Sequence, residues 1–220
     1  MAIDVTNANI SVAISKEGKI ISYQEALNSR DQSKFLPHFV NQSLENAKIE
    51  FDDLNYLIVT SGPGGFTGLR VGLAFAHSLS VVKPQIKIYA VSNFEVYAFR
   101  ASQQIKIFHQ NIVILQAFRK AFAIKIFSKS IDEPFKIIYE TQLQEFFQSL
   151  ISQNPNFIRI VSGNAMKKSW DIICDIKSLI FLPRFPFIRA SYVCKLAEKK
   201  ILQKAKFLNL DPIYCKLPNL

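Results

Sequence analysis

The sequence predicts an α/β fold, in which helices cover a sheet that contains parallel strands. Near the N-terminus, hydrophobic residues alternate with polar ones, which is typical of half-buried strands. Further along, the run Tyr56–Thr60 is short, apolar and rich in β-branched residues, as expected of a strand buried on both faces. Segments with helical spacing of hydrophobic residues separate the strands, and this alternation favours a layered α/β or α+β domain.

The first elements are predicted to be strands followed by a helix. An apolar run at Ala2–Val5 and the alternating segment Ile10–Ile14 each predict a strand, and a turn at Lys16–Lys19 leads into a third, Ile20–Tyr23. We expect two or three antiparallel strands here. Hydrophobic residues then recur at helical spacing from Ser33 to Ala47, which predicts a helix.

The middle of the chain alternates strands and helices. After the buried strand, a loop at Ser61–Phe66 leads into a helix that is predicted from Thr67 to Val81. A strand at Ile86–Val91 and a helix at Asn93–Gln103 complete the series. The resulting order is β-β-β-α-β-α-β-α.

A polar stretch over residues 101–110 separates a second series of elements, and we place a domain boundary there, giving domains 1–105 and 106–220. The second series is predicted to comprise strands at Ile112–Ala117, Ala121–Phe127 and Phe157–Val161, and helices at Thr141–Ile151 and Ala190–Ala205.

The charge is placed unevenly. Of the 27 Lys and Arg residues against 17 Asp and Glu residues, residues 1–100 hold nine of each sign, so the rest of the chain carries the whole excess. One predicted helix and its end carry a run of lysines, namely Lys195, Lys199, Lys200, Lys204 and Lys206. This run is expected either to meet nucleic-acid phosphates or to form a solvated helix face.

Composition excludes several classes of protein. With 49% hydrophobic residues and only 7 Gly and 9 Pro, the chain is not disordered, collagen-like or of low complexity. The apolar run between Arg70 and Lys83 is too short to cross a bilayer, and the N-terminus lacks the pattern of a secretory signal, so a cytoplasmic location is expected. Three widely spaced cysteines predict buried thiols rather than a metal site or a disulfide.

Five of the seven glycines fall between positions 62 and 72. A loop formed by Gly62, Pro63, Gly64 and Gly65 at a strand-to-helix junction can hold a phosphate on free backbone N–H groups. However, the segment has neither the lysine of a P-loop nor the G-x-G-x-x-G spacing.

The helix after this loop has a stripe of small residues, Gly68, Gly72, Ala76 and Ser80, beside an apolar stripe. A smooth stripe permits close approach, either by the helix's own sheet or by a partner's helix, and the sequence leaves both open. The residues assigned to the candidate partner interface are Phe66, Thr67, Gly68, Leu69, Arg70, Gly72, Leu73, Ala76 and His77.

The segment Gly-Pro-Gly-Gly-Phe-Thr-Gly-Leu-Arg-Val-Gly at residues 62–72 resembles the signature of the TsaB (YeaZ) family, in which a Gly-Pro-Gly-Ser-Phe-Thr-Gly-Leu-Arg-Ile-Gly string follows a strand. The run at residues 2–14 is similar to the family's Ala-Ile-Asp-Thr-Ser start, with Asp4 and Ser11 at the expected separation. Asp-Pro-Ile-Tyr at residues 211–214 resembles the family's Glu-Pro-Leu-Tyr ending.

The resemblance implies an actin-like/Hsp70-like (ASKHA, ribonuclease H-like) fold with two related subdomains, the second degenerate and here basic. It also implies a non-catalytic dimerisation subunit. In the family, TsaB pairs with its paralogue TsaD, and with the ATPase TsaE, so that threonylcarbamoyl is transferred to the adenosine next to the tRNA anticodon. The dimer contact there uses helices of the N-terminal subdomain, including the one after the Gly-Pro-Gly loop.

The resemblance implies that this chain by itself binds no cofactor. It implies that ATP and a metal are bound by the partner subunits. It leaves open whether the isolated chain forms a homodimer. It also leaves open whether tRNA is met indirectly or through the basic C-terminal half.

Two departures from the pattern qualify the implied site. ASKHA nucleotide sites have a glycine two residues after the first-strand Asp, whereas Thr6 follows Asp4 here, so Asp4 is only a weak candidate for cofactor binding. The family's Asp-Ala-Arg hairpin stands here as Gln116–Ala121, without the acid pair or the turn glycine.

Two enzymatic alternatives follow from the same residues. A nucleotide-binding ASKHA phosphotransferase or ATPase would act at Asp4. A glycoprotease-like peptidase would need close histidines or an exposed nucleophile, yet His38, His77 and His109 stand 39 and 32 residues apart, with neither an H-E-x-x-H nor a G-x-S-x-G motif.

Overall fold

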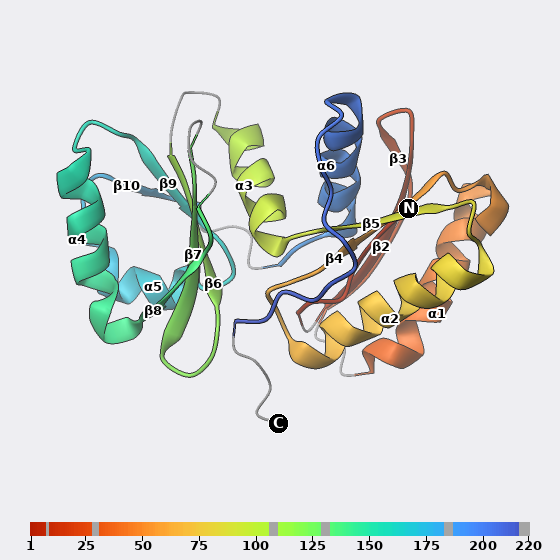
Figure 1. Ribbon diagram of the computed structural model, residues 1–220, viewed down its shortest axis with the longest axis horizontal. Coiled ribbons are helices and arrows are strands. Elements are labelled where there is room, and N and C mark those ends of the chain that lie inside the picture. Colours follow the sequence, from red (N-terminus) through yellow and green to blue (C-terminus); the bar gives the residue numbers. More distant parts are fainter. Residues whose placement is uncertain (8, 28–30, 106–109, 129–132, 183–186, 216–220) are drawn as a thin grey trace. The chain divides into compact units, whose positions relative to one another are not determined.

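The computed structural model describes residues 1–7, 9–27, 31–105, 110–128, 133–182 and 187–215 (Figure 1). The chain divides into two compact units. The first unit contains Met1–Val96 and Ile188–Tyr214, and the second contains Tyr97–Phe187 and the chain from Cys215 onward. Each unit is built on its own five-stranded sheet.

The sheet of the first unit has the order β3-β2-β1-β4-β5. Its strands are β1 (Ala2–Asp4), β2 (Ile10–Lys16), β3 (Lys19–Ala26), β4 (Tyr56–Thr60) and β5 (Lys87–Val91). β1, β2 and β3 pair antiparallel, and β4 runs parallel to both β1 and β5. The β2–β3 turn has the positive φ angles of a tight hairpin, 51° at Glu17 and 81° at Gly18.

Helices cover both faces of this sheet. α1 (Gln32–Ala47) and α2 (Phe66–Val82) pack on the face that presents Ile3 and Val5, and together they form one apolar core. α6 (Ala190–Leu202) covers the other face, where the Cys194 thiol lies 3.6 Å from the Ala13 carbonyl oxygen. A short 3-10 turn, η1 (Phe51–Asp53), precedes β4.

The sheet of the second unit has the order β10-β9-β6-β7-β8. Its strands are β6 (Gln110–Gln116), β7 (Ala121–Phe127), β8 (Lys136–Tyr139), β9 (Arg159–Ser162) and β10 (Leu179–Phe181). After β8 come the 3-10 turn η2 (Glu140–Gln142) and α4 (Leu143–Gln153), and α5 (Met166–Ile173) joins β9 to β10. Ile112, Phe122, Phe147 and Ile173 lie in its core.

The α/β fold predicted from the sequence is confirmed, and each of the two series of predicted strands forms its own sheet. Apart from the two 3-10 turns, three elements were not predicted: β8, α5 and β10. Each is short, at 4, 8 and 3 residues, and too few hydrophobic repeats fall within such lengths to define a period.

The compact units differ from the predicted division at residue 105. The boundary falls within α3 (Asn93–Gln104), and α6 returns to the first unit. The reason is that the buried side of α6 fills the second face of the first sheet, through Ala190, Val193, Cys194, Leu196 and Ala197. Consequently the lysine run assigned to a basic C-terminal domain lies in the first unit instead.

The cysteine prediction is wrong in part, because Cys174 is exposed while Cys194 is buried. In the part of the chain that the structure describes, no helix is long and apolar enough to cross a membrane.

Candidate functional site

The glycine-rich loop between β4 and α2 is packed against its own unit. The Gly65 N–H donates to the Thr6 carbonyl oxygen, and a Cβ added at Gly64 would stand 2.3 Å from that same oxygen. Asn93 Nδ2 donates to the Pro63 carbonyl oxygen at 2.9 Å. Glycine is needed at Gly64 because the loop lies against the chain after β1, where a side chain would not fit. The contacts therefore favour a packing role for the loop over binding of a phosphate.

Asp4 lies under this loop and is 0% exposed. Its Oδ1 accepts hydrogen bonds from Thr6 Oγ1 at 2.7 Å and from Thr60 Oγ1 at 2.6 Å. Its Oδ2 is buried and has no hydrogen-bond partner among the described residues. Burial raises the pKa of Asp4 to about 6, against the opposing effect of the threonine donors. The carboxylate therefore joins the ends of β1 and β4 and presents no open face.

The structure divides the nine residues predicted to form a partner interface. Five face the unit's own core, namely Gly68, Leu69, Gly72, Leu73 and Ala76. A Cβ at Gly68 would stand 1.8 Å from the Val5 carbonyl oxygen, and one at Gly72 would stand 2.7 Å from Val5 Cγ2. The small-residue stripe thus packs against the end of β1 and the start of α1. This contact supports the packing interpretation for these five positions.

The other four residues, Phe66, Thr67, Arg70 and His77, are exposed. The sequence reasoning missed their exposed neighbours Ala74, Ser78 and Val81, which continue the same helix face. The signal was present, since positions 67, 70, 74, 77, 78 and 81 follow helical spacing. We call these residues, with Phe66, the outer face of α2.

Arg70 is held in place on this outer face. Its guanidinium carbon lies 3.8 Å from the Phe66 ring centroid, and its Nε donates to Tyr214 Oη at 3.3 Å. The Phe66 and Tyr214 rings are 5.4 Å apart. The segment that carries Tyr214 is tied to the glycine-rich loop, because the Ile213 N–H donates to the Ser61 carbonyl oxygen at 2.7 Å. The motif at residues 211–214 therefore supports the start of α2.

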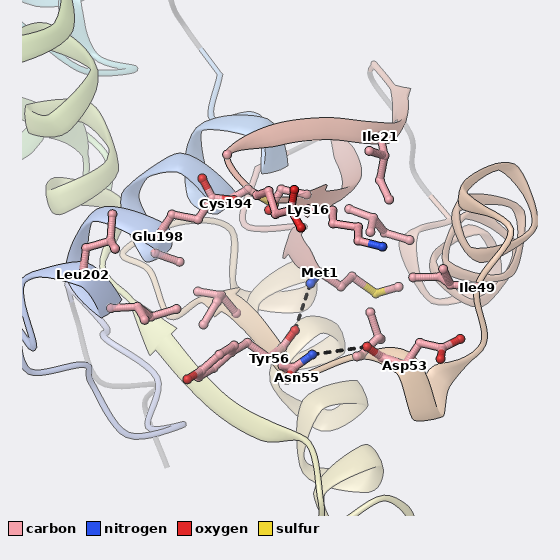
Figure 2. A pocket seen from close by; sticks show the side chains of 18 of the residues that line it. Met1, Lys16, Ile21, Ile49, Asp53, Asn55, Tyr56, Cys194, Glu198 and Leu202 are labelled. Carbon is pink, nitrogen blue, oxygen red and sulfur yellow. Dashed lines mark hydrogen bonds between the residues drawn. The ribbon is translucent and has the colours of Figure 1, made fainter.

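A pocket of about 890 Å³ lies elsewhere in the first unit, between α6, η1 and the β2–β3 turn (Figure 2). Figure 2 shows Glu198 and Leu202 of α6 across the pocket from Ile49 and Asp53, with the Met1 ammonium donating to the Tyr56 carbonyl oxygen at 2.9 Å. Most of the lining is apolar, and it also carries charged side chains of both signs. None of the residues predicted to form a site lines it.

Sequence comparisons relate the chain to one biosynthetic system. A family model described as TsaD, tRNA N6-adenosine threonylcarbamoyltransferase, matches residues 22–123. The protein named tRNA threonylcarbamoyladenosine biosynthesis protein TsaB of Buchnera aphidicola subsp. Schizaphis graminum is 38% identical over 101 residues, which are 46% of this chain and 47% of that protein. TsaB of Bacillus subtilis is 31% identical over 99 residues, 44% of this chain and 42% of the relative. The matches thus span about half the length of these relatives.

Solved structures extend the likeness to the whole chain. YeaZ from Pseudomonas aeruginosa superposes with a TM-score of 0.71 at 16% identity, covering 97% of both chains. The resemblance to the TsaB (YeaZ) family is confirmed. The inorganic polyphosphate/ATP-glucomannokinase from Arthrobacter sp. strain KM has a TM-score of 0.50 at 12% identity, covering 91% of this chain and 97% of that one. These neighbours confirm the actin-like fold class, and at such identities they establish the fold alone.

The hairpin that departs from the family pattern is the β6–β7 turn. Lys120 adopts a φ of 57° there, the conformation for which a glycine is usual. The Gln116 amide holds the turn by donating to the Phe118 carbonyl oxygen at 3.0 Å. The turn is therefore kept without its glycine.

The remaining candidates are dispersed. His38 and His77 lie exposed on different helices, and His109 lies outside the described residues. Among the residues that the structure describes, no group of three His, Cys, Asp or Glu side chains could hold a metal. In the lysine run, Lys200 pairs with Glu95 through a 2.5 Å contact and is largely buried, whereas Lys195, Lys204 and Lys206 are exposed.

Proposed function

We propose that the chain is a non-catalytic partner subunit for TsaD in the biosynthesis of threonylcarbamoyladenosine in tRNA. Support comes from relatives that are named TsaB and from the TsaD family model, whose matched region, residues 22–123, includes the glycine-rich loop and all of α2. In this proposal the transferase chemistry belongs to TsaD, and this chain completes the assembly.

The observation that carries the proposal is the outer face of α2. Of the 17 residues in this helix, only Arg70 and His77 are ionisable, and exposed positions include Phe66 at 42%, Val81 at 81% and Val82 at 71%. A helix whose exposed side carries large apolar side chains and only two ionisable ones is usually covered by another protein. We infer that the TsaD helices lie on this face.

We further propose that the chain holds no nucleotide itself, and that ATP and a metal are bound by the partner subunits. The enclosed Asp4 carboxylate and the loop packed on Thr6 support this over the phosphotransferase alternative. TsaE as a third subunit, a homodimer of the free chain and a cytoplasmic location belong to the same proposal.

The experiment is co-expression with the TsaD of the same organism, followed by size-exclusion chromatography with light scattering and a threonylcarbamoyl-transfer assay. Arg70→Glu and Ala74→Glu place charge on the outer face of α2 and are expected to abolish co-purification and transfer. Lys168→Glu is the control matched to Arg70→Glu, because it makes the same charge change at an exposed position of α5.

Gly72→Leu is unsuitable for this test, since its side chain would collide with Val5 and disturb the fold. If Arg70→Glu and Ala74→Glu remain folded and still co-purify with TsaD, the proposed interface is wrong. If the wild-type chain does not associate with TsaD, or TsaD transfers fully without it, the proposed function itself is wrong.

A further inference from the structure

Three aromatic rings form a ladder in the first unit, beside α6. The Tyr56 and Tyr89 rings stack at 6.5 Å, and the Tyr89 and Phe207 rings stack at 4.8 Å with 11° between their planes. A lysine caps each end: Lys87 Nζ lies 5.7 Å from the Tyr56 ring centroid, and Lys200 Nζ lies 5.5 Å from that of Phe207. We call these three rings the Tyr89 ladder. It links β4, β5 and the segment after α6.

The ladder holds a strongly basic segment against the sheet. Residues 199–206 contain four lysines and no acid. Immediately after them, Phe207 stacks on Tyr89, and Leu208 exchanges two backbone hydrogen bonds with Ala90, at 3.0 and 3.1 Å. Lys204 and Lys206 are therefore exposed cations on a segment that is fixed to the sheet rather than loose. This fixation lowers the conformational entropy that a ligand would have to overcome in ordering them.

A solvated helix face explains only part of this arrangement. Lys199 and Lys200 lie in the last turn of α6, where cations are favoured by the helix dipole, and Lys200 is neutralised by Glu95. Lys204 and Lys206 lie beyond the helix, and Lys87 comes from β5 at the opposite end of the ladder. Exposed cations therefore lie at the Tyr56 end of the ladder, in Lys87, and just before Phe207 in the sequence, in Lys204 and Lys206.

We propose that the Tyr89 ladder and its exposed lysines, Lys87, Lys204 and Lys206, bind the sugar-phosphate backbone of an RNA. The inference deepens the proposed function, because it assigns a tRNA contact to this subunit itself. Exposed cations beside aromatic rings are the pattern of nucleic-acid surfaces. Glu198 and Asp53 line the pocket that begins at Tyr56 (Figure 2), so phosphates are expected to follow the lysines and avoid that pocket.

The test measures binding of the full chain to a fluorescent tRNA transcript by anisotropy across a range of salt concentrations. Lys204→Glu/Lys206→Glu is expected to weaken binding by about tenfold or more and to reduce the salt slope by about two, one for each phosphate that is no longer neutralised. The matched control, Lys167→Glu/Lys168→Glu on α5, changes the same charge at exposed positions and is expected to change affinity by less than about twofold.

A second variant tests the ladder separately. Phe207→Leu keeps every lysine but removes the stacking, so it is expected to weaken binding by about threefold with the salt slope unchanged. Equal losses in both double variants would overturn the proposal, as would no loss in Lys204→Glu/Lys206→Glu. Displacement of the tRNA by poly-glutamate at equal charge would also overturn it, in favour of an acidic protein partner. Co-purification with TsaD is measured for the same variant. If Lys204→Glu/Lys206→Glu still co-purifies with TsaD, a change in its tRNA binding tests the RNA site alone and not the proposed function.

Discussion

The two units repeat one strand order but place different helices after the fourth strand. In each sheet a three-stranded antiparallel portion is extended by two parallel strands, so β6, β7, β8, β9 and β10 correspond to β1, β2, β3, β4 and β5. Between the last two strands the first unit has the 17-residue α2, and the second has the 8-residue α5. A helix of eight residues is therefore long enough to connect two neighbouring parallel strands of this sheet.

The loops before these two helices follow one rule. A Cβ at Gly64 would stand 2.3 Å from the Thr6 carbonyl oxygen, and one at Gly163 would stand 2.0 Å from that of Ile114. In both units a glycine lets the loop touch the backbone of the first strand or the chain that follows it. The glycine is thus a requirement of the fold. The extra length of α2 and the exposed Phe66 and Val81 on its outer face are not, and the partner interface is expected to use this difference.

The largest effects are expected from breaking the shared loop. Gly64→Val and Gly163→Val should each lower the free energy of unfolding by more than about 3 kcal/mol, because the new side chain meets backbone that cannot move aside. Gly18→Ala is the control, since its φ is positive at 81° but nothing lies within 4 Å of its added Cβ. It should cost about 1 kcal/mol. Denaturant unfolding measures all three, and a Gly64→Val protein as stable as Gly18→Ala would contradict the shared role.

The second difference between the units is a buried acid. β6 contains no Asp or Glu, whereas β1 buries Asp4, whose pKa is raised from 3.8 to about 6. Because the folded pKa exceeds the unfolded one, the stability that protonated Asp4 contributes is present below pH 4 and is lost as the pH rises through 6. Asp4→Asn should therefore gain about 3 kcal/mol relative to the wild type between pH 4 and pH 7.5.

Hydrogen exchange followed by peptide mass spectrometry measures the free energy of unfolding of each unit separately, for both the wild type and Asp4→Asn. The pH dependence should appear in peptides of the first unit and be absent from the β6–β7 hairpin. A wild type and an Asp4→Asn variant with parallel pH profiles would show that Asp4 titrates normally.

The helices before the fourth strand end differently in the two units. α1 ends at Lys48, which has a φ of 54° and donates its N–H back to the Glu45 carbonyl oxygen. α4 is closed instead by the buried Arg159, whose guanidinium donates to the carbonyl oxygens of Leu150 at 3.1 Å and Asn154 at 2.6 Å. Arg159→Met should cost about 2 to 3 kcal/mol, because it removes the charged donor that holds these carbonyl oxygens at the end of α4.

Chemical denaturation followed through Trp170, the one tryptophan of the chain, reports on the second unit directly. Lys48→Gly is the companion variant for α1 and should raise the free energy of unfolding by about 1 kcal/mol, because glycine has no Cβ to strain in the left-handed conformation. Its unfolding is followed by circular dichroism, since Trp170 lies in the second unit. A loss in Lys48→Gly as large as that in Arg159→Met would remove the distinction between a side-chain cap and a backbone cap.

The sequence predicted the first unit better than the second for a physical reason. Every strand and helix of the first unit was predicted, and β4 with the bounds observed, because its apolar run is sharply bounded. In the second unit, β7 was also predicted with the bounds observed, but β8, α5 and β10 were not. β10 has three residues and gains its strand geometry only from pairing with β9. Tertiary pairing of this kind leaves little trace in a local pattern.

The helix that carries the candidate interface was predicted, but which of its sides faces the core was not. Helical spacing located α2 and its small stripe, yet Gly68 and Gly72 suit close approach to any neighbour, and only the position of Val5 assigns them to the interior. In the same way, the pairing of Lys200 with Glu95 joins residues 105 apart in sequence. Neither contact follows from spacing along one helix.

The smallest effect on stability is expected at the end of α2, where the difference between the units is purely one of surface. Val81→Ser/Val82→Ser should change the free energy of unfolding by less than about 0.5 kcal/mol, since both side chains are largely exposed. The same variant should weaken association with TsaD by about tenfold in calorimetric titration, because two apolar side chains no longer lose water on binding. Leu202→Ser removes an exposed apolar side chain from α6 and should leave that affinity unchanged. If Leu202→Ser weakens association as much, apolar exposure in general would explain the binding, and α2 would have no special part in it.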